Sequence, residues 1–390
     1  MATPHRSLTA LLVVASLVGA FALGAVSNLV NASQQPRGPA KLKTASAAMP
    51  RIGLAYGNVL PWMSDAERAA ALDDAVSIGV GWIRTDLSWA DIQPDGPTTY
   101  RWESFDRVVV AAAARKLRIL PVVSYTPGWS RPGCGSDKCP PDHPQQFAAF
   151  VAAATARYAS RGIHSWEIWN EPNLPMFWAP RPDPVAFARL LDAAATAVHA
   201  ADRTATVISG GLAAVATDDP HPDGRVGTLG YLEKVCTAGG LRSVGVVGYH
   251  PYTYPFLLSA RASWSATRNH VADQPARLQT VLTRCGRGPV PIWLTEYGAP
   301  TGGPGRASDG SAGSVHPRPD HVTEARQAQI AADAVRAVTG NAGVPALFWY
   351  SDRDLGHDGQ TNENFFGLRR TDGTPKPAWA AFRSAIAAAR

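Results

Sequence analysis

The 390-residue sequence carries little charge, since Asp, Glu, Lys and Arg together make up 17% of it. The formal net charge of +6 depends on the first 50 residues, which contain Arg6, Arg37, Lys41 and Lys43 and no acidic residue. Without these four, 33 basic residues remain against 31 acidic ones, and no sustained run of Lys or Arg occurs among them. The composition therefore gives little support to nucleic-acid binding.

Cysteine is also scarce, and no two of the four cysteines have the two-residue spacing that structural zinc sites use. Cys134 and Cys139 lie close together in a loop rich in Pro and Gly, and Cys236 and Cys285 each fall near the end of an expected helix. Two disulfides formed in an oxidising compartment, Cys134–Cys139 and Cys236–Cys285, are the favoured interpretation, with four unpaired thiols as the alternative. We expect no metal site.

The N-terminal residues have the composition of an export segment. An uncharged, mostly apolar stretch over residues 8–30 follows Arg6, and a polar stretch follows it. It is longer than the roughly 7–15 apolar residues of a signal peptide and long enough for the about 20 that a spanning helix needs. We therefore expect residues 1–32 to be a signal peptide or a membrane anchor and residues 33–50 a flexible linker, which would place the protein outside the cell or in the cell envelope.

From residue 51 onward, short apolar runs alternate with Ala-rich amphipathic segments. Eight such strand–helix units without a linker between them predict one (β/α)8 TIM barrel domain over residues 51–390. A doubly wound open sheet is the alternative, but no Gly-rich phosphate loop follows the first strand. The strands are expected at 52–57, 82–89, 118–125, 165–170, 205–211, 243–250, 291–296 and 345–351, and the helices at 65–78, 102–117, 144–159, 184–201, 229–238, 265–284, 323–339 and 377–389.

Two glutamates that lie close to tryptophans stand at the ends of two of these strands. Glu171 follows the fourth strand directly before Pro172, and Glu296 ends the seventh strand two residues before Gly298. In an eight-stranded barrel these positions face each other across the mouth, where the active sites of this fold lie. Cleavage of a glycosidic bond needs two such carboxyl groups, one as a proton donor and one as a nucleophile or base.

Two carboxyl groups can take two roles only if their surroundings differ. The indole of Trp169 or Trp178 beside Glu171 is expected to raise the pKa of that carboxyl, which would make it the acid. Hydrogen bonds from Tyr252 or Arg84 are expected to keep Glu296 ionised. A solvated charge at the barrel rim is the alternative for either glutamate.

These motifs resemble those of the clan A retaining glycoside hydrolases. The sequence Trp-Asn-Glu-Pro occupies 169–172, and Thr-Glu-Tyr-Gly occupies 295–298. The form of residues 166–173, Tyr-His-Pro-Tyr at 249–252, and the Phe-Gly-Leu to Pro-Ala-Trp stretch at 366–379 are most similar to family 39. Within that family they resemble bacterial endoglycosidases of secreted polysaccharides, and cellulase-like enzymes of family 5 come next. The resemblance covers essentially all of the barrel.

The resemblance implies roles for particular residues. Glu171 would be the acid/base and Glu296 the nucleophile of a double displacement. The substrate-binding residues that it implies are Asn170 at the 2-hydroxyl of the sugar, Trp349 as a platform beneath the sugar, His250 and Tyr252 on the lining of the site, and Arg84 in support of Glu296.

Each supporting residue also has a purely structural interpretation. Arg84 could simply pair with Asp86 or another buried carboxylate, His250 could be a core histidine, and Trp349 could belong to the barrel packing. Trp129 and Trp178 are further candidates for sugar platforms, because an indole stacks on the apolar face of a sugar. Packing of their loops is an equally good explanation.

Together these patterns predict an exported, retaining O-glycosyl hydrolase that acts on a polysaccharide or glycan without a metal or organic cofactor. Several aromatic residues near an open rim favour cleavage within the chain over trimming of its ends. We expect a monomer that does not bind nucleic acid, with membrane anchoring through residues 8–30 as an option. A barrel that binds carbohydrate without cleaving it, and a transglycosylase that uses the same carboxylates, are the alternatives.

Overall fold

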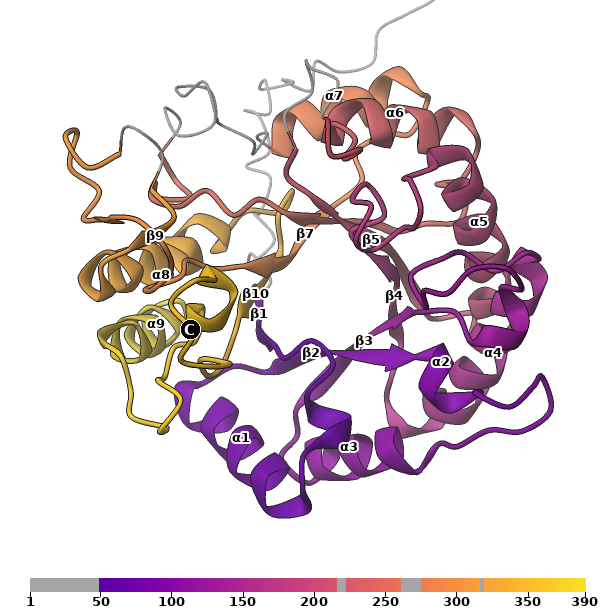
Figure 1. The fold of residues 1–390 in the computed structure, drawn as a ribbon, viewed down its shortest axis with the longest axis horizontal. Coiled ribbons are helices and arrows are strands. Elements are labelled where there is room, and N and C mark those ends of the chain that lie inside the picture. The colour runs from indigo at the N-terminus through magenta and orange to yellow at the C-terminus, as the bar shows by residue number, and fades with distance from the viewer. Residues whose placement is uncertain (1–48, 216–221, 261–274, 316–318) are drawn as a thin grey trace, which may run out of the picture. The chain divides into compact units, whose positions relative to one another are not determined.

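The computed structural model describes residues 49–215, 222–260, 275–315 and 319–390. Eight parallel strands close a barrel in the order β1-β10-β7-β6-β5-β4-β3-β2 (Figure 1). This confirms the expected (β/α)8 architecture. The barrel strands are β1 (Arg51–Ala55), β2 (Trp82–Ser88), β3 (Arg118–Ser124), β4 (Ser165–Asn170), β5 (Thr206–Ala213), β6 (Val246–His250), β7 (Ile292–Tyr297) and β10 (Ala346–Tyr350).

Helices surround the ring of strands and cover its outer face (Figure 1). They are α1 (Asp65–Ile78), α2 (Trp89–Ile92), α3 (Glu103–Ala114), α4 (Pro144–Tyr158), α5 (Pro184–Ala201), α6 (Thr228–Thr237), α7 (Pro275–Arg284), α8 (Glu324–Val338) and α9 (Pro377–Ala388). Two short strands, β8 (Ala307–Ser308) and β9 (His321–Val322), pair with each other outside the barrel. The first ten residues of the expected helix 265–284 lie outside the described residues.

Local signals in the sequence fix where these helices begin and end. Before α1, the Ser64 hydroxyl accepts from the backbone N–H of Glu67, whose carboxylate accepts from the backbone N–H of Ser64. This reciprocal capping box satisfies two N–H groups that the first helical turn leaves without partners. Gly79 ends the helix at a φ of +94°, a backbone conformation in which glycine costs least. The expected bounds of α1 are therefore reproduced without change.

The barrel has one apolar core outside the strands and a second one inside them. The outer core fills the space between strands and helices and includes Trp166 and Trp349. The inner core consists only of strand residues, with Trp82 and Tyr350 packed against its members Ala55, Leu120, Ile208, Val246, Trp293, Ala346 and Phe348. Because side chains alternate between the two faces of a strand, one strand supplies both cores.

The two disulfides form between the cysteines that the sequence paired, Cys134–Cys139 and Cys236–Cys285. The first closes a short loop after β3, and the second joins the C-terminal end of α6 to the residue after α7. The expected export segment and nearly all of the expected linker fall within residues 1–48, outside the described residues. Within the described ranges, no helix is both long and apolar enough to cross a bilayer.

Candidate active site

A cavity of about 540 Å³ opens at the carboxyl ends of the barrel strands. Backbone and side chains from β1 to β10 line it, and most of the polar ones are ionisable or phenolic. These are Asp86, Tyr125, Lys138, Glu171, Arg225, His250, Tyr252, Tyr254, Glu296, Tyr350 and Glu363, and Asn170 lies among them. The cavity therefore contains both glutamates that the sequence singled out.

The end of β4 departs from regular strand geometry and thereby presents two consecutive residues to this cavity. Trp169 has a φ of +74° and Glu171 a φ of +41°. Ile168 and Trp169 both pack into the outer core, whereas Asn170 and Glu171 both line the cavity. Non-glycine residues in this backbone region cost about 1–3 kcal/mol and concentrate at functional sites.

A β-bulge in β7 likewise lets two consecutive residues point inward. Between β7 and β10 the register passes from Leu294 opposite Leu347 to Tyr297 opposite Trp349, so three steps on β7 face two on β10. The extra residue lets both Thr295 and Glu296 reach inward, where each contacts groups of the barrel interior. Bulges of this kind re-aim side chains beside active sites.

The two carboxylates come close to each other. His250 Nδ1 lies 2.9 Å from Glu171 Oε1 and 3.6 Å from Glu296 Oε2. The ligand atoms of these three residues all lie within 4.8 Å of one another. Retaining glycosidases hold their carboxyl groups about 5–5.5 Å apart and inverting ones about 6.5–9.5 Å. The spacing matches the retaining geometry.

Arg84 ties Glu296 to the barrel interior. Its guanidinium donates to Glu296 Oε1, to Asn170 Oδ1 at 2.8 Å and, through Nε, to Glu167 Oε2 at 2.6 Å. The sequence interpretation of Arg84 as the support of Glu296 agrees with these contacts, and so does its pairing with another buried carboxylate. Such a fully buried charge is tolerated only when it is paired and hydrogen-bonded.

Glu167 is a site residue that the sequence reasoning missed. It is fully buried, and its Oε1 accepts from the Gly211 N–H at 3.0 Å and from the Thr295 hydroxyl at 2.9 Å. The sequence did carry a signal for it, because an acidic residue in the middle of a mostly apolar strand is unusual. The Glu167 side chain points into the barrel, as that of Arg84 does. Glu167 holds Arg84 from behind and so fixes Glu296 indirectly.

His250 is buried and lies between Glu171 and Glu296. Its Nε2 lies 3.0 Å from the Thr295 hydroxyl, which itself donates to Glu167. Nε2 must therefore donate to Thr295, and Nδ1 faces the Glu171 carboxyl. The ring has room only because Gly211 lacks a side chain, since a Cβ there would lie 2.0 Å from Nε2.

The two carboxylates differ electrostatically. Burial raises the pKa of Glu171, and the contact with His250 offsets this only in part. Burial acts on Glu296 too, but the neighbouring His250 and Arg84 and the hydrogen bond from the Tyr252 hydroxyl at 2.8 Å together lower its pKa. Glu171 is thus suited to donate a proton and Glu296 to stay ionised, the division that two-carboxylate catalysis requires.

In the part of the chain that the structure describes, Glu171, His250 and Glu296 are the side chains whose ligand atoms lie close enough together to hold a metal ion. Their surroundings do not suit a divalent cation. The Arg84 guanidinium and the Tyr252 hydroxyl already hold one oxygen each of Glu296, and a second positive charge beside Arg84 would be repelled.

The structure contradicts the expected role of Trp349. Its side chain is fully buried in the outer core, where its indole N–H donates to Phe366 O and its ring packs against Tyr297 and Phe382. The cause is the alternation along β10, which points Phe348 and Tyr350 toward the barrel axis and Trp349 toward α9. Tyr350 lines the cavity in its place.

The two loop tryptophans are not among the residues that line the cavity. Trp178 is buried against Trp169 and Phe187, so it is part of the core. Trp129 is half-buried, packs against Trp89 and donates its indole N–H to Gln93 O at 2.7 Å. Loop packing is therefore the correct interpretation for Trp178, and the platform hypothesis is wrong for it. For Trp129, which lies outside the lining of this cavity, the platform role stays a prediction.

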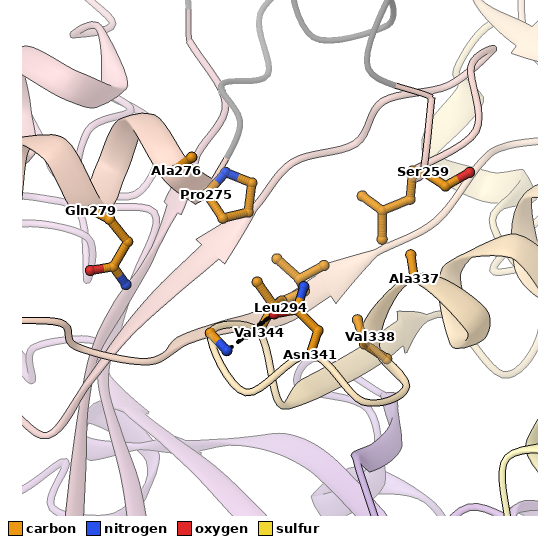
Figure 2. Close-up of a pocket in the computed structure, with 11 residues that line it drawn as sticks. Ser259, Pro275, Ala276, Gln279, Leu294, Ala337, Val338, Asn341 and Val344 are labelled. Atoms are coloured by element: carbon orange, nitrogen blue, oxygen red, sulfur yellow. Dashed lines mark hydrogen bonds between the residues drawn. The ribbon is translucent and has the colours of Figure 1, made fainter. Parts of the chain in front are cut away.

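A second cavity of about 440 Å³ lies on the outer side of the barrel (Figure 2). It is bounded by the start of α7, the end of α8 and Leu294 of β7, with Ser259, Gln279 and Asn341 as its polar side chains. Among the described residues, its lining contains no ionisable side chain. The chemistry of the protein is therefore to be sought at the strand ends.

An eight-stranded parallel barrel with paired glutamates at the ends of β4 and β7 defines a clan A glycoside hydrolase, and enzymes of this clan act with retention. A family model described as cellulase (glycosyl hydrolase family 5) matches residues 42–349. The chain belongs to this family. No curated protein matches the sequence.

Solved structures of families 39 and 5 share the fold. One is a family 39 glycoside hydrolase from the gut symbiont Bacteroides cellulosilyticus, with a TM-score of 0.63, 22% identity, and coverage of 87% of this chain and 64% of that one. A family 39 β-xylosidase from Caulobacter crescentus has a TM-score of 0.60, 20% identity and coverage of 87% and 73%. A family 5 enzyme from Streptomyces cattleya, solved with GlcNAc, has a TM-score of 0.61, 21% identity and coverage of 88% and 81%.

These matches confirm the predicted clan, with families 39 and 5 as its relatives. The chain spans just under two thirds of the length of the Bacteroides enzyme.

Proposed function

We propose that the protein is an exported glycoside hydrolase that cleaves O-glycosidic bonds within a polysaccharide or glycan by double displacement. The single observation that carries the reaction is the opposite tuning of two neighbouring carboxylates: the pKa of Glu171 is raised and that of Glu296 is lowered.

Each step assigns a bond and a proton to a named group. Glu171 donates its proton to the glycosidic oxygen while Glu296 attacks the anomeric carbon, so the bond to the leaving group breaks and a glycosyl ester on Glu296 forms. Glu171, now ionised, takes a proton from water, which attacks the same carbon and releases Glu296. Arg84 and Tyr252 stabilise the negative charge that returns to Glu296.

Cleavage within the chain is supported by the extent of the cavity. The line between Glu171 and Glu296 has lining residues on both sides. On one side, Asp86 and Tyr350 come from β2 and β10 and Tyr125 directly follows β3; on the other side, His250 and Tyr254 come from β6 and the loop after it. A site lined on both sides can hold sugar units on both sides of the bond.

Export is supported by the apolar N-terminal stretch and by two disulfides, which persist in oxidising compartments. We place the protein outside the cell or in the cell envelope, with anchoring through residues 8–30 as the membrane-bound option. Fractionation of cells that express the full chain, before and after release of peripheral proteins, tests this. Recovery in the cytoplasm with reduced cysteines would contradict it.

The reaction is tested with a panel of 2-deoxy-2-fluoro glycosyl fluorides, which trap the glycosyl-enzyme. Intact and peptide mass spectrometry should find a sugar-sized adduct on the peptide that contains Glu296. The absence of an adduct across the panel, with folded protein, would favour a barrel that only binds carbohydrate.

Substitution separates the two roles. Glu296→Gln should abolish the adduct and lower turnover by at least about 10⁴-fold. Glu171→Gln should lower turnover by about 10²–10⁴-fold. Near-normal turnover of either folded variant would overturn the mechanism, and products longer than the substrate would reassign the reaction to transglycosylation.

A further inference from the structure

On the wall of the cavity formed by β2 and β3, a group of three side chains takes no part in the reaction described above. Asp86 comes from β2, Tyr125 follows β3, and Lys138 comes from the loop closed by the Cys134–Cys139 disulfide. All three line the cavity. The Lys138 ammonium lies 3.2 Å from the centre of the Tyr125 ring, and Tyr125 and Lys138 both act on the charge of Asp86.

Asp86 is a buried carboxylate with spare acceptor capacity. Only 7% of the residue is exposed. The Tyr125 hydroxyl forms a side-chain hydrogen bond with it, while the neighbouring Arg84 is engaged by Glu167, Asn170 and Glu296. An ionised carboxylate has about four acceptor sites. Because Asp86 lines the cavity, it can accept a further hydrogen bond from a ligand there.

The loop that carries Lys138 is tied to its neighbours. The Thr126 N–H donates to Asp137 O at 2.8 Å, and the Ala179 N–H donates to Lys138 O at 3.1 Å. The disulfide closes the loop around these two bonds. The backbone therefore positions the Lys138 side chain at the Tyr125 ring, on the wall of the cavity.

The backbone of Tyr125 has the same left-handed conformation as two residues of the reaction centre. Its φ is +69°, and among the cavity residues Glu171 and Tyr252 are the others with a left-handed backbone and a side chain. Strain of this kind persists where the surrounding structure holds it for function. Tyr125 thus shares a structural signature with two residues of the reaction centre.

We propose that Asp86, Tyr125 and Lys138 form a subsite that binds an unmodified neutral sugar unit through two adjacent hydroxyls. Asp86 accepts a hydrogen bond from one hydroxyl, and the Lys138 ammonium donates to the oxygen of the next. Tyr125 keeps the two side chains apart and in register. The inference rests on the proposed function and specifies which substrate that function takes.

Charge and shape make the subsite selective. A uronate or sulfate group would add a negative charge beside the Asp86 and Asp137 carboxylates. The Lys138 ammonium is already paired with Asp137 at 3.3 Å, so such a group is disfavoured. An O-acetyl or O-methyl group would remove the hydroxyl donor to Asp86, which a site built to hydrogen-bond that hydroxyl discriminates against.

The test measures binding without turnover. Glu171→Gln protein is titrated calorimetrically with β-linked tetrasaccharides of glucose, mannose, xylose and galactose, and the one that binds is compared with its mono-deoxy analogues. Adding Asp86→Ala should weaken binding by about 10- to 100-fold, and Asp86→Asn and Lys138→Met should weaken it less. Asp142→Asn is the matched control and should stay within about twofold, since Asp142 is exposed and does not line the cavity.

The deoxy analogues identify the hydroxyls. Removal of one hydroxyl should weaken binding to the parent but cost nothing further in the Asp86→Ala variant, because the two changes remove the same contact. If the Asp86 and Lys138 variants bind a tetrasaccharide as tightly as the Glu171→Gln protein alone, this inference is overturned. Cleavage of that tetrasaccharide by the protein with Glu171 intact would leave the proposed function standing. If folded protein neither binds nor cleaves any of the four, the proposed function falls, and this inference falls with it.

Discussion

The same strands supply both halves of the barrel interior, but one half is apolar and the other is charged. In the lower half, Trp82 and Trp293 pack with Phe348 in an apolar core. Two residues further along β2 stands Arg84, which binds Glu167 and Glu296 in the upper half. The lower half gains free energy from burial. Burying charges costs free energy in the upper half. The arrangement there is therefore explained by the positioning of Glu296 rather than by stability.

The largest contrast is expected from one substitution in each half. Glu167→Gln removes the charge that holds Arg84 and should lower kcat by about 10²-fold through misplacement of Glu296, besides weakening the fold. Phe348→Ala should lower the free energy of unfolding by about 3–5 kcal/mol and leave kcat of the folded protein unchanged. Urea unfolding and kcat, measured on the same samples, check both. An equal loss of kcat in Phe348→Ala would erase the distinction.

Two glycines give a closer comparison. A Cβ at Gly211 would lie 2.0 Å from His250 Nε2, and a Cβ at Gly53 would lie 2.5 Å from the Phe348 ring. Both alanine variants should be destabilised by about 1–3 kcal/mol. Only Gly211→Ala should also lower kcat/KM, by roughly 10-fold to 10²-fold, since it moves the ring that bridges Glu171 and Thr295. Thermal melts with steady-state kinetics separate the two effects.

The pH profile of kcat/KM tests the division between the carboxylates. Glu171 must be protonated, and because its pKa is raised, activity should persist above the ordinary range of a glutamate and then fall about tenfold per pH unit. Glu296 must be ionised, and because its pKa is lowered, the acid limb should lie below that range. Glu171→Gln should remove the alkaline limb. The two apparent values belong to the pair as a whole.

The smallest effect is expected at Trp129, where the aromatic surface lies outside the cavity. Trp129→Phe loses the hydrogen bond to Gln93 O and should cost about 1 kcal/mol of stability, with KM unchanged within about twofold. Tyr350→Ala, within the cavity, should raise KM clearly. A raised KM in Trp129→Phe would support the platform hypothesis for this residue.

The fold was predictable because its signal is repeated eight times. Strand β4 and helices α1 and α5 have the expected bounds, since their ends carry strong local signals such as the Asp183 cap before Pro184. The helix expected over 102–117 is shorter, as α3 ends at Ala114. Element ends depend on tertiary packing, which a single sequence does not display.

The site was predictable where a residue carries its chemistry in its local motif, as Glu171 and Glu296 do. The site was not predictable where it depends on which side chains of a strand point into the barrel. One residue of register separates Trp349 from Tyr350, and one bulge in β7 turns Glu296 inward. Glu167 was missed because its partners Arg84, Gly211 and Thr295 lie far away in the sequence, on other strands.

The left-handed backbone at Tyr125, Glu171 and Tyr252 sets a limit on how this enzyme can be made more robust. Glycine would relieve about 1–2 kcal/mol at each position, yet it would remove the side chain that the cavity needs. A selection for heat resistance alone would thus drift toward inactive barrels. A screen for more thermostable variants therefore has to measure turnover together with stability.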